Sequence, residues 1–301
     1  MDQIVSTPRA ARICAALAAA SIAWSSIFIE LSHASGSTAG FFRCLYALPL
    51  LFTFVLWERR RYGPRPWRRC LPGLLGGIFF GVDLVLWGQA IGDVGAGLAT
   101  VLANIQVVGV PLVAWLIFSE HPSNKVLYAI PVTIIGVLLI SGVCESGAYG
   151  RDPTAGALLG VAAGLAYTGA LLALRHGGAD LRRPGGPLFD LTVSGMVTCA
   201  IIGALWGNID FAPVFPGAWW LILLALTSQV MGWTLLTISL PRLPAALTSL
   251  LLMIQPVGSL ILGALIFGAD PSLLQIMGVG LLLGAVLFAT RPGAGSTTNT
   301  V

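Results

Sequence analysis

The chain has 301 residues and a formal net charge of +4; 56% of its residues are hydrophobic and only 9% are charged. Its mean hydropathy is +0.90. Soluble domains carry about 25% charged residues, so this composition excludes a water-soluble globular protein. Membrane topology accounts for the small basic excess, which gives no reason to expect a nucleic-acid partner.

Ten apolar runs of about 20 residues follow one another along the chain. A helix of that length crosses roughly 30 Å of hydrocarbon. The expected fold class is therefore an all-α membrane protein with ten transmembrane helices. We expect these helices at about 13–31, 38–57, 71–91, 95–118, 126–143, 155–174, 188–207, 217–240, 244–267 and 272–290.

The basic residues gather on one side of this topology. If the N-terminus is cytoplasmic and the chain crosses ten times, 14 of the 16 Lys and Arg residues lie in cytoplasmic segments, and Arg43 and Arg151 do not. The positive-inside rule therefore predicts that the N- and C-termini are both cytoplasmic. We expect a multi-pass protein of a plasma (bacterial inner) membrane.

The two halves of the chain contain an internal repeat. Without gaps, nine residues of one stretch recur 149 positions later in the other. The first members of these pairs are Leu98, Leu102, Ile105, Gln106, Leu116, Ile117, Phe118, Pro122 and Ser123, and the second members are Leu247, Leu251, Ile254, Gln255, Leu265, Ile266, Phe267, Pro271 and Ser272. A repeat at half the length of an apolar chain indicates a duplicated transporter fold.

Five helices in each half would place the two repeats in opposite orientations in the membrane. Two inverted five-helix repeats can exchange conformations and expose one site to each side in turn, which is alternating access. We therefore expect a cytoplasmic N-terminus at 1–12, a first repeat at 13–143 and an outer linker at 144–153. The second repeat is expected at 154–291, followed by a disordered cytoplasmic tail at 292–301.

Two charged residues lie near the predicted outer ends of the first two helices. Glu30 ends the first helix, and Arg43 lies about one turn into the second. A charge within the membrane is costly and is a functional candidate by default. One interpretation is an ion pair that locks the helical hairpin. In the other, Arg43 holds a substrate carboxylate with its forked guanidinium and Glu30 contributes to a gate.

Asp83 lies past the middle of the third predicted helix and has no basic neighbour in sequence. Trp87 follows one turn later on the same side, so the two residues are expected to form part of a cavity wall. Asp83 is a candidate for binding a substrate ammonium group or for carrying a coupling proton. The alternative is a structural role, either paired with Arg43 or hydrogen-bonded to neighbouring helices.

Polar and aromatic residues in the middle of other predicted helices complete the candidate substrate-binding or coupling site. They are Trp24, Asn104, Gln106, Tyr167, Gln229, Trp233 and Gln255. The repeat-related Gln106 and Gln255 either form interhelical hydrogen bonds or contact substrate. Trp24 and Tyr167 either line the cavity or pack between helices.

Glu120 is a second candidate for a gate or latch. It ends the fourth predicted helix, where an acid opposes the helix macrodipole and needs a cationic partner such as Lys125. The three histidines fall in loops on different faces, which argues against a metal cluster. We find no motif of a nucleophilic, metal-dependent or ATP-driven enzyme. No catalytic residue, metal or cofactor is therefore expected.

Several short motifs, taken in order, resemble a known family. They are Trp24-Ser25-Ser26, Phe42-Arg43, Leu116-Ile117-Phe118-Ser119-Glu120 with Pro122, Gly136-Val137-Leu138-Leu139-Ile140, Gln255-Pro256 and Leu265-Ile266-Phe267-Gly268. Together they are similar to the ten-helix EamA-type branch of the drug/metabolite transporter superfamily, which includes amino-acid exporters. Ala269 and Asp270 stand where that family usually has Glu, so the resemblance gives no role to an acid there.

The resemblance implies a secondary transporter of small organic metabolites, foremost an exporter of amino acids that works by alternating access. The alternatives are a passive channel or facilitator, or a carrier of other metabolites, drugs or lipids. We expect a small-molecule substrate, the lipid bilayer and a proton as coupling ion to be its partners. The expected assembly is a monomer or a weak homodimer.

Overall fold

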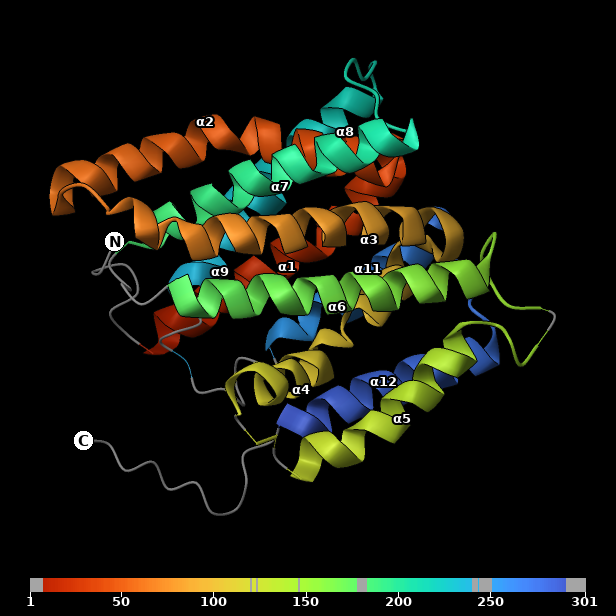
Figure 1. Cartoon of the computed structure of the whole chain (residues 1–301). Helices are drawn as coiled ribbons and strands as arrows, with labels where there is room; N and C mark the ends of the chain where they lie inside the picture. Colours follow the sequence, from red (N-terminus) through yellow and green to blue (C-terminus); the bar gives the residue numbers. More distant parts are fainter. Residues whose placement is uncertain are drawn as a thin grey trace.

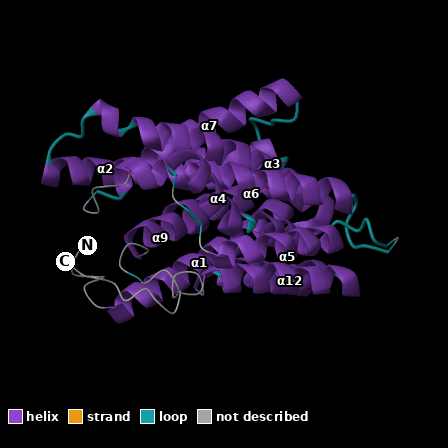
Figure 2. Ribbon diagram, turned by 60° about the horizontal axis from the view of Figure 1, so that its bottom comes forward, coloured by secondary structure: helices purple, strands orange, loops and turns teal. Residues whose placement is uncertain are grey.

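A computed structural model describes residues 8–119, 121–122, 124–145, 147–177, 183–239, 243 and 251–290. Within these ranges every regular element is a helix, and no strand occurs (Figures 1 and 2). The elements are α1 (Pro8–Ser32), α2 (Gly36–Tyr62), the 3₁₀ helix η1 (Trp67–Arg69), α3 (Leu71–Ala103), α4 (Gln106–Phe118), α5 (Asn124–Ile140), α6 (Pro153–Gly177), α7 (Gly185–Trp206), α8 (Gly217–Leu224), the π-helix η2 (Ala225–Gly232), α9 (Trp233–Ser239), α11 (Ile254–Phe267) and α12 (Leu273–Thr290).

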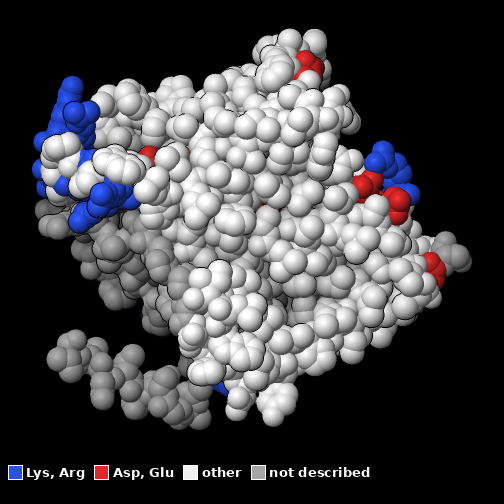
Figure 3. All heavy atoms as spheres, in the orientation of Figure 1, with Lys and Arg blue, Asp and Glu red and all other residues white. Residues whose placement is uncertain are grey.

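The predicted all-helical class is confirmed. In the described part of the chain, six helices are long and apolar enough to cross a membrane, and four shorter ones are also apolar. Lys and Arg side chains gather at the end of the molecule where α2 ends and α3 begins, and a broad band with almost no charge separates this end from the other (Figure 3). Such a band suits hydrocarbon surroundings.

Gly95 lies at the boundary between the helices predicted at 71–91 and 95–118. It is the non-helical residue inside α3, with φ +79° and ψ 162°, a conformation that L side chains rarely adopt. A side chain here would also meet the ring of Tyr149, because a Cβ atom would lie 3.1 Å from its Cε1 atom. The boundary therefore depends on glycine for two independent reasons.

The prediction of one continuous helix over 95–118 is wrong. The helix is interrupted at Asn104 and Ile105, and α4 begins at Gln106. Backbone bonds of Asn104 to Val101 (3.0 Å) and of Ile105 to Leu102 (3.1 Å) span three residues instead of four. This tighter turn ends the α-helical ladder, and hydrophobic length alone could not reveal it.

The helix predicted at 217–240 is also irregular, because the π-helical η2 separates α8 from α9. Of the helix predicted at 244–267, residues 244–250 lie outside the described part of the chain. The same holds for Glu120 and for the predicted disordered tail at 292–301.

Glycines allow α3 and α7 to pack with their backbones in close contact. A Cβ atom on Gly81 would lie 2.5 Å from the Cβ atom of Thr198 and 2.8 Å from the carbonyl oxygen of Gly195. A Cβ atom on Gly77 would lie 2.6 Å from that of Ser194. Small residues at helix contacts are the usual means of close packing in membranes. This contact fixes α3, which carries Asp83, against α7.

We expect Gly81→Leu to prevent correct packing of α3 on α7, because overpacking a close contact costs about 1–3 kcal/mol or more. Gly92→Leu is the matched control on the same helix, since nothing lies within 4 Å of a Cβ atom there. Size-exclusion chromatography of detergent-purified protein should give one symmetric peak for the control and aggregate for Gly81→Leu. Equal monodispersity of the two variants would contradict this packing.

A carboxylate at the end of α2 caps the start of α7. Glu58 is buried, and its oxygens accept hydrogen bonds from the backbone N–H groups of Gly185 (2.7 Å) and Gly186 (3.1 Å). Helix N-termini present such donors and favour negative charge. Beside this cap, Arg65 forms an ion pair with Asp190 of α7. The basic end of the molecule is therefore held together by polar contacts.

We expect Glu58→Ala to lower the free energy of unfolding by about 2 kcal/mol, because hydrogen bonds to charged groups contribute roughly 1.5–3 kcal/mol. Arg59→Ala, at the exposed neighbouring position, should have little effect. The measurement is the thermal unfolding midpoint of both variants in detergent. Matching midpoints for Glu58→Ala and wild type would show that the cap is dispensable.

Candidate functional site

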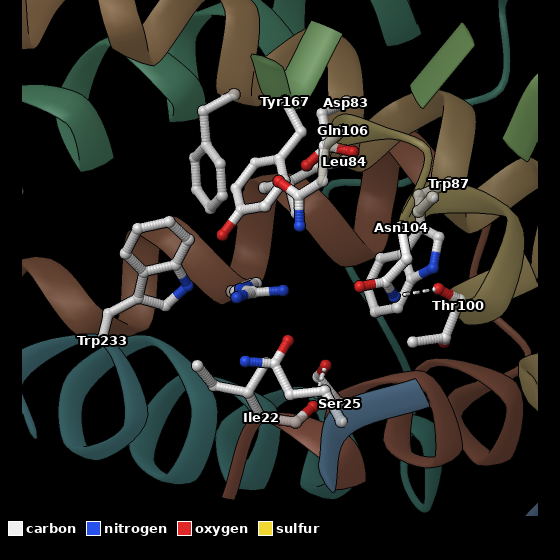
Figure 4. Close-up of a pocket in the computed structure, with 14 residues that line it drawn as sticks. Ile22, Ser25, Asp83, Leu84, Trp87, Thr100, Asn104, Gln106, Tyr167 and Trp233 are labelled. Atoms are coloured by element: carbon white, nitrogen blue, oxygen red, sulfur yellow. Dashed lines mark hydrogen bonds between the residues drawn. The ribbon is translucent and has the colours of Figure 1, made fainter. Parts of the chain in front are cut away.

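A cavity lies between the two ends of the helices, with walls from α1, α2, α3, α4, α6, α9 and α11 (Figure 4). It encloses about 530 Å³ of empty space with its mouth included. Helices that are far apart in sequence thus enclose one candidate binding site.

Eight of the ten predicted substrate-binding or coupling residues line this cavity: Arg43, Asp83, Trp87, Asn104, Gln106, Tyr167, Trp233 and Gln255. They come from elements far apart in sequence, and Figure 4 shows several of them pointing into the same space. Phe80, which shares the side of Asp83 on its helix, also lines the cavity. The lining residues that sequence reasoning missed are Ile22, Ser25, Leu84, Thr100 and Ala103. Small or apolar residues inside apolar helices give no signal of their own.

Trp24 is not among the residues that line the cavity. Its side chain is 40% exposed and stacks on Phe28, with ring centroids 5.7 Å apart. Its neighbour Ser25 faces the cavity instead. One residue along an α-helix turns the side chain by about 100°, so a mid-helix position alone could not decide which of the two faces inward.

Arg43 is buried in the cavity wall and is held by neutral partners. Its Nε donates to Oε1 of Gln229 at 2.8 Å, and its Nη2 donates to Oγ of Ser228 at 3.1 Å. Its guanidinium carbon lies 5.6 Å from the centroid of the Phe80 ring, a cation–π distance. The guanidinium is thus fixed in place while its charge is not neutralised by these contacts.

Gln229 lies behind the cavity wall and positions Arg43. It is fully buried, and its Nε2 donates to Oγ1 of Thr192 at 3.0 Å while its Oε1 receives the bond from Arg43. Ser228 and Gln229 both reach Arg43 because they lie in η2, where the wider π-helical turn changes the direction of consecutive side chains. The sequence suggested Gln229 as a polar residue in an apolar helix but gave no sign of the π-helix.

The interpretation of Glu30 and Arg43 as an ion pair is wrong. An oxygen of Glu30 instead accepts the backbone N–H of Ala96 at 3.0 Å, the first amide after Gly95. Glu30 therefore fastens the end of α1 to the turn in α3. Burial and the nearby Glu30 carboxylate raise the pKa of the Tyr149 phenol, whose ring packs on the same turn.

Asp83 faces the cavity, and the Arg43 guanidinium is near enough to act on its charge without contacting it. Asp83 is 8% exposed, and neither a hydrogen bond nor an ion pair of its carboxylate occurs in the described part of the chain. The two ion pairs found there join Arg65 to Asp190 and Arg151 to Asp93. The predicted alternative of an ion pair between Asp83 and Arg43 is therefore not formed.

Three buried polar atoms in the cavity lining have no hydrogen-bond partner among the described residues. They are Nε1 of Trp87, Nε1 of Trp233 and Oε1 of Gln106. A buried polar group without a partner costs roughly 1–3 kcal/mol, so such groups need an explanation. Water or a polar ligand in the cavity would satisfy all three. Within the described residues, no three His, Cys, Asp or Glu side chains are grouped as metal ligands.

Comparison with known proteins gives a consistent picture. Residues 10–142 and residues 154–291 each match the EamA-like transporter family. No curated protein matches the chain significantly. A crystal structure of a protein that is 16% identical superposes with a TM-score of 0.60, covering 93% of this chain and 97% of that chain. At that identity the likeness shows the fold alone.

Proposed function

Because the chain belongs to the EamA-like transporter family of multi-pass membrane transporters of small molecules, we propose that it exports small zwitterionic metabolites, foremost amino acids. Export would proceed across the plasma membrane by alternating access. We further propose that a proton is the coupling ion and that the protein acts as a monomer or weak homodimer.

The single observation that carries this proposal is a fixed cation and an unpaired acid in one small cavity. Arg43 has five N–H donors, of which its bonds to Gln229 and Ser228 use two. The remaining donors are available to a carboxylate, for which a guanidinium is well shaped. Asp83 supplies the opposite charge. A zwitterion offers each of them an oppositely charged group at hydrogen-bond distance, which neither has among the described residues.

The unpartnered polar atoms add detail to this binding mode. The indole N–H groups of Trp87 and Trp233 are donors, and Oε1 of Gln106 is an acceptor. A carboxylate and an ammonium group together would satisfy atoms of both kinds. Tyr167 and Trp233 meet edge to face with centroids 5.9 Å apart, so the rest of the substrate would contact aromatic walls.

Coupling to protons would follow from competition for Asp83. The carboxylate binds either a proton or the substrate ammonium group, so each transport cycle exchanges one for the other. Two states of the chain are required, and the matches to residues 10–142 and 154–291 support a division into two five-helix repeats. The arginine-rich end in Figure 3 supports a cytoplasmic location for that end. A cytoplasmic location of both termini is part of the proposal.

The test is counterflow in proteoliposomes loaded with a panel of unlabelled amino acids, with and without a pH gradient. We expect saturable uptake of one labelled class, accelerated by its unlabelled form on the opposite side. A passive channel gives no such acceleration, because its flux needs no exchange. Absence of counterflow for every amino acid with monodisperse protein would reject this substrate class.

A further inference from the structure

A second, larger hollow lies on the outside of the helices and is separate from the transport cavity. It is a groove between α3, α4 and α6 with about 1300 Å³ of empty space, its open side included. Leu71, Leu75 and Phe79 form one wall, Ile117 lies on α4, and Leu165 and Gly169 lie on α6. The one polar side chain of its lining, Thr168, donates its hydroxyl to the Gly164 carbonyl at 2.9 Å.

The groove is strongly exposed and has the length of one lipid leaflet. Leu75 is 52% exposed and Ile117 is 65% exposed. From Leu71 to Phe79 the helix rises about 12 Å at 1.5 Å per residue. Half of a hydrocarbon core of roughly 30 Å is about 15 Å, so the groove matches a single layer of acyl chains.

An aromatic ring, that of Phe79, lies at the inner end of the groove. A Cβ atom on Gly169 would lie 2.8 Å from the ring of Phe79, so the bare glycine lets this ring seat against α6. The next residue, Phe80, lines the transport cavity on the other side of the same helix. A chain bound in the groove would therefore lie against the wall of the transport cavity without entering it.

The open end of the groove meets the basic end of the molecule. Arg68 and Arg69 are exposed and precede the groove residue Leu71 by three and two positions. Trp67 is 67% exposed beside them, as is usual for tryptophan at the membrane–water boundary. Figure 3 shows how strongly positive charge is concentrated at this end. A ligand with an apolar chain and an anionic head would match the apolar groove and the arginines at its open end.

We propose that this groove binds one anionic phospholipid, with an acyl chain along α3 and the phosphate held by Arg68 and Arg69. The bilayer leaflet on the arginine-rich side supplies the lipid. Basic residues at the membrane surface attract anionic headgroups, and the groove adds the apolar contact that makes binding stoichiometric. The site does not depend on which metabolite the cavity carries.

Native mass spectrometry of the full chain, released from detergent with added phosphatidylglycerol, phosphatidylcholine or glycerol 3-phosphate, tests the proposal. We expect one tightly bound phosphatidylglycerol and at least tenfold weaker phosphatidylcholine. Glycerol 3-phosphate, which has the anionic head without a chain, should not bind. Equal binding of the two lipids, or binding of glycerol 3-phosphate alone, overturns the proposal.

Two pairs of variants locate the site. Arg68→Gln with Arg69→Gln should weaken phosphatidylglycerol roughly 30-fold, whereas Arg59→Gln with Arg60→Gln, an equal charge change at exposed positions of α2, should not. Leu75→Trp should fill the groove and reduce binding of both lipids. Leu74→Trp, outside the groove, should leave lipid binding unchanged. Equal effects within either pair place the lipid elsewhere and contradict the proposal.

Discussion

Replacing Arg43 by lysine should reduce amino-acid counterflow by roughly 100-fold, although the positive charge is kept. Lysine is a point charge without the planar fork that binds a carboxylate through two parallel hydrogen bonds. It also cannot keep the bonds to Gln229 and Ser228 while facing the cavity. Removing one partner of a buried charged hydrogen-bond pair costs about 2–5 kcal/mol, which covers a 100-fold loss. Initial rates in proteoliposomes measure this.

The controls separate substrate binding from folding. Arg43 is buried, so a variant could lose activity by unfolding, and the thermal midpoint of each purified variant must therefore be compared with wild type. Gln229→Leu should give an intermediate result, because it leaves the guanidinium but removes its positioning bond. We expect its KM to rise about tenfold with little change in maximal rate. A well-folded Arg43→Gln variant with normal KM would refute substrate contact by this residue.

The most reliable sequence signals were charges and repeats in apolar surroundings. Arg43 and Asp83 stand out because isolated charges in hydrocarbon are costly, and both line the cavity. The repeat-related Gln106 and Gln255 also line this cavity, although they lie on different halves of the chain. The free-energy cost of a charge in the bilayer depends on the residue and on its neighbours in sequence, so a single sequence is enough to reveal it.

Features that depend on helix rotation or backbone irregularity were not predictable. Trp24 and Ser25 are adjacent, and only the packing of α1 decides that the serine faces the cavity. The interruption at Asn104 arises from three-residue backbone bonds, and both flanking segments are equally apolar. The same holds for η2, whose sequence fits an ordinary membrane helix although its geometry is π-helical.

The bonding partners of buried charged residues were also not predictable from the sequence. Glu30 and Arg43 are near in sequence and on the same predicted side, which favoured an ion pair. Glu30 instead bonds the backbone of Ala96, 66 residues away, and Arg43 bonds Gln229, 186 residues away. Long-range partners of this kind are set by how the helices assemble, and neutral groups can supply the hydrogen bonds of a buried charged residue.

Replacing Asp83 by asparagine should abolish the effect of a pH gradient on export. Asparagine has nearly the same shape but cannot take up a proton, so proton entry can no longer displace the substrate. We expect an acidic exterior to accelerate wild-type efflux of a preloaded amino acid and to leave Asp83→Asn efflux unchanged. The lost charge should also raise the counterflow KM by roughly tenfold or more, because hydrogen bonds to charged groups contribute about 1.5–3 kcal/mol.

Asp210→Asn provides the control, since Asp210 is exposed and its carboxylate accepts only a local backbone bond from Ala212 among the described contacts. Its efflux should respond to the gradient like that of wild type. If Asp83→Asn keeps both the pH response and the normal KM, Asp83 binds neither the proton nor the ammonium group. The coupling proposal then fails while the role of Arg43 stands. The two roles are tested separately, because the Arg43 variants are judged by counterflow rate and KM and Asp83→Asn is judged by its pH response.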